Sequence, residues 1–230
     1  MNLAIALLFQ DGNFVGREYF QRLEEAEIPL RLVAPVGRMS EASISIEQAR
    51  TGNLWNPPPI PEARIDRRFE SLADPALWQS LRETGIDVAV QGGIGILKRD
   101  MLAVPRIGFV NVHPGRLPDY RGNSCPEWAL FNGDDIYATA HIIDEGIDTG
   151  PVICEGRYEI DPGWNYPALR AHLYAHCARV LIEALRLLDR AADDPSRVLT
   201  PQDPAAGHYW RPIPDQERAV VAARLERAQR

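Results

Sequence analysis

The chain has 230 residues, of which 45% are hydrophobic and 25% are charged. This composition is typical of a globular protein, and it excludes a disordered or fibrous chain. The formal net charge is -7, which argues against a large nucleic-acid partner, because proteins that bind phosphate backbones usually carry a basic excess.

The first half of the chain alternates between predicted strands and helices. An apolar run over 3–9 predicts a strand that is covered on both faces, and this run is too short to span a membrane. The further predicted elements are a helix over 15–27, a strand over 30–34, a helix over 40–50, an extended Pro-rich loop over 51–61, a short strand over 64–68, a helix over 74–84 and a strand over 87–91.

The second half continues the alternation and ends in a tail. Its predicted elements are strands over 109–113, 139–143 and 151–158, a long helix over 166–190 with an apolar stripe, and a polar terminal helix over 216–230. This order predicts a doubly wound α/β fold with a mainly parallel, Rossmann-like sheet over residues 1–200 and a C-terminal extension over 201–230. Ligands of such sheets bind beyond the carboxyl ends of the strands.

Two separate stretches carry residues suited to acyl transfer. Asn111 and His113 are two residues apart on a predicted strand, so their side chains leave the same face, and Pro114 ends the strand. Asp148 lies in a Gly-rich turn that can reach the same edge. An amide and a protonated imidazole can stabilise an oxyanion, and a carboxylate can accept a proton from an attacking amine. A structural Asn–His pair and an Asp used for turn geometry remain the alternative.

The sequence resembles the folate-dependent formyltransferase family. The segments NVHPGRLPDYRG and HIIDEGIDTGPVI are similar to the two signature motifs of that family, in the same order and with matching spacing. The resemblance implies a formyltransferase fold, 10-formyltetrahydrofolate as the formyl donor, no metal, and Asn111, His113 and Asp148 as catalytic residues. It also implies that the donor's pterin lies against Ile94, Gly95, Ile96 and Leu97 and against the turn that contains Asp144 and Gly146.

Sequence features that differ from those of other family members reduce the number of candidate acceptors. The purine-pathway enzymes, which formylate glycinamide ribonucleotide, have a Gly-rich phosphate loop after the first strand, where this chain has FQDGNF with an Asp that would repel phosphate. Methionyl-tRNA formyltransferases carry an extra β-barrel domain, and the stretch after residue 190 is too short for one. Formyltetrahydrofolate hydrolases usually have an N-terminal regulatory domain. We therefore expect a small primary amine as acceptor. The segment DYRGNSCPEWALFNGD resembles sugar-nucleotide N-formyltransferases more than the purine-pathway enzymes, and this resemblance implies an amino-sugar nucleotide as the first candidate.

Three residues are candidates for the acceptor side, namely Asn13, Trp55 and Arg121. Trp55 could stack on a base or sugar, although a loop anchor packed on the body is an equal alternative, and Arg121 could equally form a surface salt bridge. His172 and His176 lie four residues apart on the long helix, but His176 falls on the apolar stripe, so we expect no metal site. Three cysteines without metal-type spacing suit a reducing cytoplasm.

Three functions remain open at this point. Formyl transfer to an amine and hydrolysis of the same donor would use the same residues. A non-catalytic nucleotide-binding module is the third, and it is weakened because no G-x-G-x-x-G follows the first strand. We expect a small-molecule substrate, no nucleic-acid or membrane partner, and a possible homodimer contact through the C-terminal helix.

Overall fold

A six-stranded sheet forms the centre of the protein, and the computed structural model describes residues 1–203 and 205–228. In spatial order the strands are β2 (Leu32–Arg38), β1 (Ile5–Asp11), β3 (Val88–Gln91), β4 (Gly108–His113), β6 (Tyr137–Ile142) and β7 (Val152–Arg157). The first four run parallel to one another, whereas β6 is antiparallel to both β4 and β7. The predicted α/β fold with a mainly parallel sheet is therefore confirmed.

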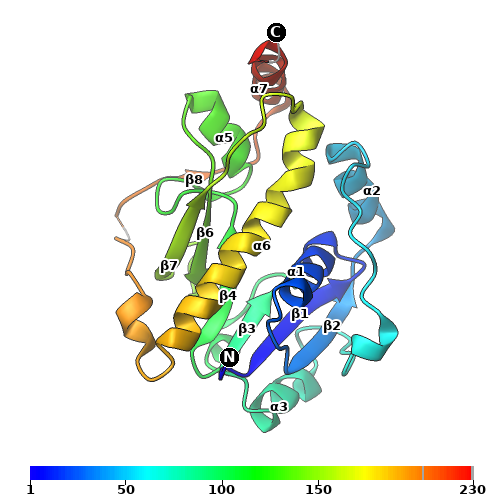
Figure 1. Ribbon diagram of the computed structural model, residues 1–230, viewed down its shortest axis with the longest axis vertical. Coiled ribbons are helices and arrows are strands. Elements are labelled where there is room, and N and C mark those ends of the chain that lie inside the picture. The colour runs from blue at the N-terminus through cyan, green and yellow to red at the C-terminus, as the bar shows by residue number, and fades with distance from the viewer. Residues whose placement is uncertain (204, 229–230) are drawn as a thin grey trace.

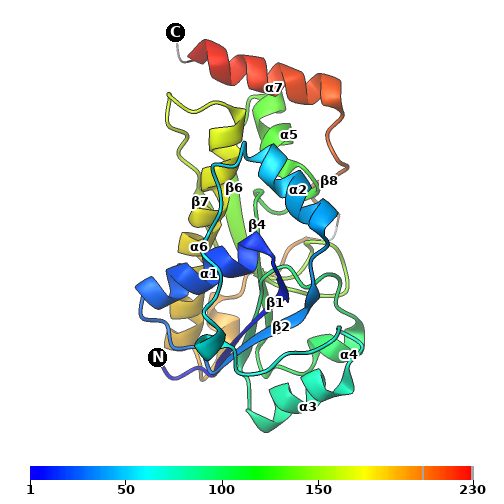
Figure 2. The ribbon, with the colours of Figure 1, turned by 90° about the vertical axis from the view of Figure 1, so that its right-hand side faces the viewer.

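Helices cover both faces of this sheet (Figures 1 and 2). One face carries α1 (Phe14–Glu25) and α6 (Tyr166–Arg190), and the other carries α3 (Pro75–Glu83) and the short α4 (Arg99–Leu102). Alternate residues of β1 enter the two cores: Leu7 belongs to the same cluster as Leu23 of α1, and Leu8 to the same cluster as Leu81 of α3. The strand is buried on both faces for this reason, which explains its continuous apolar run.

Side chains at the helix starts explain where several helices begin. Asn13, Ser40, Asp74 and Asn165 precede α1, α2 (Glu41–Arg50), α3 and α6, and each accepts a hydrogen bond from a backbone N–H in the first turn. The long helix occupies the predicted range, and its apolar stripe is buried against the sheet. No helix among the described residues is long and apolar enough to cross a membrane.

After α6 the chain returns to the body of the domain. There β8 (Tyr209–Trp210) pairs in parallel with β5 (Arg121–Gly122), and α7 (Asp215–Ala228) packs on α5 (Cys125–Asn132), as Figure 2 shows. Trp210 stacks on Tyr120 at a centroid distance of 5.5 Å and donates from its indole N–H to the carbonyl of Asp119. The C-terminal segment is thus joined to the body through a two-stranded sheet and an aromatic stack.

Two parts of the sequence prediction were wrong or incomplete, and a third part cannot be compared with the structure. The stretch over 64–68 is not a strand, because the chain makes a short turn at Glu62–Arg64 and then follows the edge of β2, where Asp66 exchanges hydrogen bonds with Val33. The helices α4 and α5 and the β5–β8 pair were not predicted. The last two residues of the predicted terminal helix, 229 and 230, lie outside the described residues.

Candidate active site

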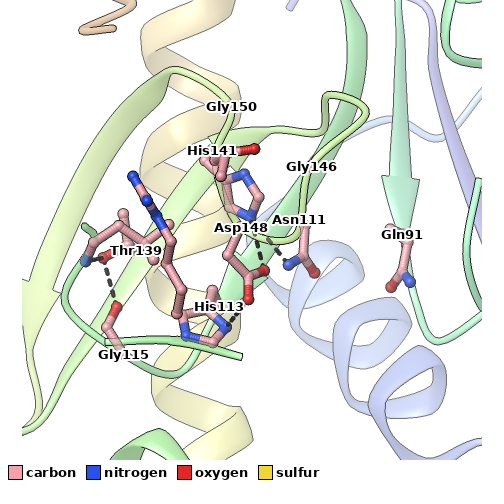
Figure 3. A network of polar contacts seen from close by, with 12 residues as sticks. Gln91, Asn111, His113, Gly115, Thr139, His141, Gly146, Asp148 and Gly150 are labelled. Carbon is pink, nitrogen blue, oxygen red and sulfur yellow. Dashed lines mark hydrogen bonds and ion pairs between the residues drawn. The ribbon is translucent and has the colours of Figure 1, made fainter. Parts of the chain in front are cut away.

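Three side chains converge at the carboxyl end of β4 (Figure 3). Asn111 and His113 leave the same face of this strand, and Asp148 reaches them from the loop that joins β6 to β7. The Oδ2 atom of Asp148 lies 3.4 Å from Nδ1 of His113, and His113 is only 4% exposed. We call Asn111, His113 and Asp148 the reactive cluster. The structure brings together the three residues that the two motifs supply from distant parts of the chain.

The hydrogen bonds of His113 define which of its ring nitrogens can exchange a proton. Its Nε2 lies 2.6 Å from the backbone carbonyl of Tyr120. Because a carbonyl can only accept, Nε2 carries a hydrogen in either charge state of the ring. The other nitrogen, Nδ1, faces the carboxylate of Asp148. A proton on Nδ1 would therefore face the carboxylate of Asp148, with which the imidazolium form of His113 makes an ion pair.

His141 on β6 orients the amide of Asn111. Its Nδ1 donates to the carbonyl of Ile142 at 3.1 Å, so in the neutral ring Nε2 is free to accept from Asn111 Nδ2 at 3.2 Å. Burial lowers the pKa of His141 to about 4, although the charge of Asp148 acts in the opposite direction. A neutral His141 thus fixes Asn111 with one hydrogen of its amide nitrogen left free.

The turn after His113 requires a glycine. A Cβ atom at position 115 would lie 2.7 Å from His113 Nε2 and 2.6 Å from the carbonyl oxygen of Tyr120, which is too close for any side chain. Thr139 of β6 holds the same turn, since its hydroxyl donates to the carbonyl of Gly115 at 2.7 Å and accepts from the N–H of Leu117 at 3.3 Å. The close approach of this backbone keeps the imidazole in place.

The loop that carries Asp148 is held from two sides. The N–H of Gly122 donates to Asp148 Oδ2 at 2.9 Å, and Asp148 itself has a positive φ of 55°. The side-chain amide of Gln202, in the C-terminal segment, donates to the carbonyls of Asp148 at 3.0 Å and Gly150 at 2.6 Å. The sequence analysis missed Gln202, and nothing in the sequence around it indicates that this residue lies at the reactive cluster.

The residues predicted for the donor side fall into two groups. Ile94 and Leu97 are buried in the core beneath the sheet, whereas Ile96 is 86% exposed and Gly95 has open space around it. Asp144 and Gly146 line a groove of about 440 Å³ with Leu102 of α4 and Ile143. The second group thus forms part of the wall of a groove, and the donor-binding role of both groups stays a prediction.

The three residues predicted for the acceptor side all have partners within the protein. Trp55 is 5% exposed, stacks on Tyr174 at 4.6 Å and donates to Glu18 at 3.0 Å, which fits the loop-anchor alternative. Arg121 is buried and donates to Gln202 and to backbone carbonyls of the C-terminal segment, and among the described residues it forms no salt bridge. The amide oxygen of Asn13 caps α1. A direct acceptor contact by any of them stays a prediction.

The described residues contain no cluster of three or more His, Cys, Asp or Glu side chains that could hold a metal ion. His172 stacks on Trp164 at 4.4 Å, and His176 donates to the carbonyl of Gly156 at 2.9 Å. Burial, followed by the charges of Asp148 and Glu127, raises the pKa of the Cys125 thiol. This cysteine is accordingly a packed side chain rather than an activated nucleophile.

A doubly wound sheet with an amide, an imidazole and a carboxylate at the end of its fourth strand is the arrangement expected from the two signature motifs. The family model described as formyl transferase matches residues 17–185. The chain therefore belongs to the formyl transferase family, as its resemblance predicted.

Individual relatives differ in the substrates that their names state. The chain is 37% identical over 153 residues to a methionyl-tRNA formyltransferase of Deinococcus radiodurans, covering 63% of this chain and 48% of the relative. It is 35% identical over 167 residues to a methionyl-tRNA formyltransferase of a Roseiflexus species, covering 70% of this chain and 50% of the relative. The chain thus spans about half the length of these curated relatives.

Solved structures share the fold at low sequence identity. A phosphoribosylglycinamide formyltransferase of Streptococcus pneumoniae has a TM-score of 0.59 at 23% identity, covering 81% of this chain and 99% of that structure. A formyltransferase of Anoxybacillus kamchatkensis, solved with a UDP-linked formamido sugar and tetrahydrofolate, has a TM-score of 0.53 at 16% identity, covering 94% and 89%. At these identities the likeness shows the fold alone.

Proposed function

We propose that the protein transfers a formyl group from 10-formyltetrahydrofolate to the primary amine of a small molecule. The observation that carries this proposal is the convergence of Asn111, His113 and Asp148 at one strand end, in a chain that belongs to the formyl transferase family. No Ser or Cys nucleophile is required, because the incoming amine is itself the nucleophile.

The reactive cluster can serve each stage of this transfer. The amine nitrogen attacks the formyl carbon, and a new C–N bond forms as the bond from that carbon to N10 of the folate breaks. Asn111 has one amide hydrogen left after it donates to His141, and this hydrogen can stabilise the oxyanion that develops on the formyl oxygen. Asp148 accepts the proton that the amine loses, and that proton finally leaves on N10. In its protonated form, His113 pairs through Nδ1 with the carboxylate of Asp148.

The groove beside α4 supports the donor side of the proposal. It is lined by the apolar side chains of Leu102, Ala103 and Ile143, by Arg99, and by Asp144, Glu145 and Gly146 of the loop that leads to Asp148. An apolar wall next to charged and polar groups suits a flat ring with hydrogen-bonding edges, such as a reduced pterin. Asp144 is held in place there, since it accepts from the hydroxyl of Thr149 at 2.6 Å and the N–H of Gly146 at 3.1 Å.

An amino-sugar nucleotide is the acceptor that we propose first. The net charge of -7 disfavours a long phosphate backbone as partner. The carboxylate of Asp11 lies at the end of β1, 3.4 Å from Arg68, where the purine-pathway enzymes have their phosphate loop. Methionyl-tRNA is the second candidate, and the 37% identity to the Deinococcus radiodurans enzyme favours it.

A comparison of acceptors tests this proposal. Purified protein is mixed with 10-formyltetrahydrofolate that carries an isotopic label in the formyl group, and then with amino-sugar nucleotides, charged methionyl-tRNA, glycinamide ribonucleotide or no acceptor. We expect labelled formamide on an amino-sugar nucleotide, and its loss in His113→Ala. Labelled methionyl-tRNA alone would replace the amino sugar by the second candidate. Cleavage of the donor at the same rate with and without amines would contradict transfer and indicate hydrolysis.

A further inference from the structure

A cleft of about 290 Å³ opens beside the reactive cluster, and its walls come from α2, α5, α6 and the segment between β4 and α5. Pro114, which follows His113 directly, forms one part of the wall. Gly122, whose N–H donates to Asp148, forms another. The cleft therefore adjoins the reactive cluster on a side that is separate from the groove beside α4.

A buried ion pair lines this cleft. Glu127 of α5 and Arg170 of α6 are 3% and 4% exposed, and Arg170 Nη1 lies 3.5 Å from Glu127 Oε1. The hydroxyl of Tyr166 also donates to that oxygen, at 2.7 Å. Within the described part of the chain, Glu127 Oε2 and Arg170 Nε have no hydrogen-bond partner. Because buried polar atoms are nearly always paired, and a buried ion pair is weak support for stability, these two atoms point to a ligand.

The charges around the cleft indicate which chemical groups such a ligand carries. Arg170 is balanced by Glu127, and Arg50 pairs with Glu47 at 3.3 Å. The described residues that line the cleft therefore offer no unpaired positive charge that would bind an anion. The ligand must accept a hydrogen bond from Arg170 Nε and donate one to Glu127 Oε2. A hydroxyl group can do both, and two neighbouring hydroxyls can satisfy both atoms at once.

We infer that this cleft binds the sugar ring of the acceptor, with Glu127 and Arg170 holding neighbouring ring hydroxyls while the amine faces the reactive cluster. The inference rests on the proposed function and specifies its substrate class as a hydroxyl-bearing amine. Tyr174 lines the same cleft, and its ring is stacked on Trp55 and carries the guanidinium of Arg170 over it at 5.8 Å. These contacts hold the Arg170 side chain in place beside the cleft.

The test combines removal of one hydroxyl from the ligand with substitution of the residue that is proposed to bind it. Formylation kinetics are measured with free aminohexoses and with their deoxy analogues that lack one hydroxyl each but keep the amine. In the wild type, loss of the hydroxyl bound by Glu127 raises KM by about tenfold or more, because a charged acceptor is left unpaired. In Glu127→Gln, which keeps the size of the side chain, this penalty falls to about threefold, since the hydroxyl then bonds a neutral amide in place of a charged carboxylate.

Matched variants separate binding from folding. Glu183→Gln on the exposed side of α6 is the control, and it leaves the hydroxyl penalty as in the wild type. Arg170→Lys keeps the positive charge and removes Nε, so it abolishes the penalty at the second hydroxyl. Near-UV circular dichroism checks that each variant is folded. If neither cleft variant folds, the deoxy series with the wild type decides, because a cleft that holds no hydroxyls shows no penalty.

The outcomes distinguish this inference from the proposed function. Equal KM values for the aminohexoses and all deoxy analogues, or the same penalties in Glu127→Gln as in the wild type, would overturn the inference while formylation stands. If the wild type formylates none of these amines and none of the amino-sugar nucleotides either, the proposed function fails. Binding of the aminohexoses by saturation-transfer NMR then decides on the cleft: a signal lost in Glu127→Gln supports it, and no signal with the wild type refutes it.

Discussion

Replacement of Gln202 by Ala is expected to slow the reaction although this residue does not belong to the reactive cluster. Its amide donates to the carbonyls of Asp148 and Gly150 and accepts from Arg121, and it therefore joins the C-terminal segment to the loop that presents the carboxylate. Two hydrogen bonds at about 1 kcal/mol each give roughly 2 kcal/mol for holding this loop. If this free energy is lost entirely from the positioning of Asp148 in the transition state, kcat falls by about thirtyfold.

The assay is steady-state formyl transfer, with donor and acceptor varied separately and the melting temperature recorded for each variant. We expect kcat to fall while KM for the donor changes little, because Gln202 does not line the groove beside α4. Gln202→Glu should be at least as slow, since a carboxylate would face two carbonyls. Gln79→Ala, on the exposed side of α3, is the control and should leave kcat unchanged. A lowered melting temperature with an unchanged kcat would refute the positioning role.

Three further predictions follow from the same geometry. His113→Ala should reduce kcat/KM by about 10² to 10⁴, in the same transfer assay, with folding preserved by circular dichroism. Gly115→Ala should lower kcat because its Cβ would displace the imidazole of His113 and the carbonyl of Tyr120; a wild-type rate would contradict the close approach. His141, whose burial lowers its pKa from 6.5 to about 4, should contribute up to about 3 kcal/mol of stability that is present at neutral pH and lost as the pH falls from about 6.5 to about 4. Urea unfolding should show this loss in the wild type and not in His141→Gln, and equal pH dependence in both would count against a neutral His141.

The parts of the fold that depend on local pattern were predictable from the sequence. The strand with Asn111 and His113 is apolar and ends at a proline, and the long helix shows its stripe over 166–190. The reactive cluster followed from two motifs whose side chains point to one strand end. The strand and the helix are encoded within a few residues of where they lie, whereas the cluster, drawn from two distant segments, followed from the resemblance of its two motifs to a known family.

The supports of the reactive cluster could not be predicted in the same way. Gln202 lies 54 residues after Asp148 along the chain, and only the return of the C-terminal segment to β5 brings them together. The burial of Trp55 and Arg121 likewise depends on partners from distant segments, which the Pro-rich loop and the YRG stretch do not reveal. Within the stretch over 64–68, Asp66 bonds to Val33 of β2, and the isolated bridge to that strand lies just beyond it at Phe69, so the contacts that decide against a strand come from a distant segment.

Transfer of the labelled formyl group is the most direct test of the central claim that Asn111, His113 and Asp148 act together on a folate-borne formyl group. The measurement is mass spectrometry of the amine after incubation with purified protein and labelled 10-formyltetrahydrofolate. The account predicts labelled formamide with the wild type and almost none with Asp148→Asn, whose amide cannot take up the proton of the amine. Labelled product formed at the wild-type rate by Asp148→Asn would contradict it.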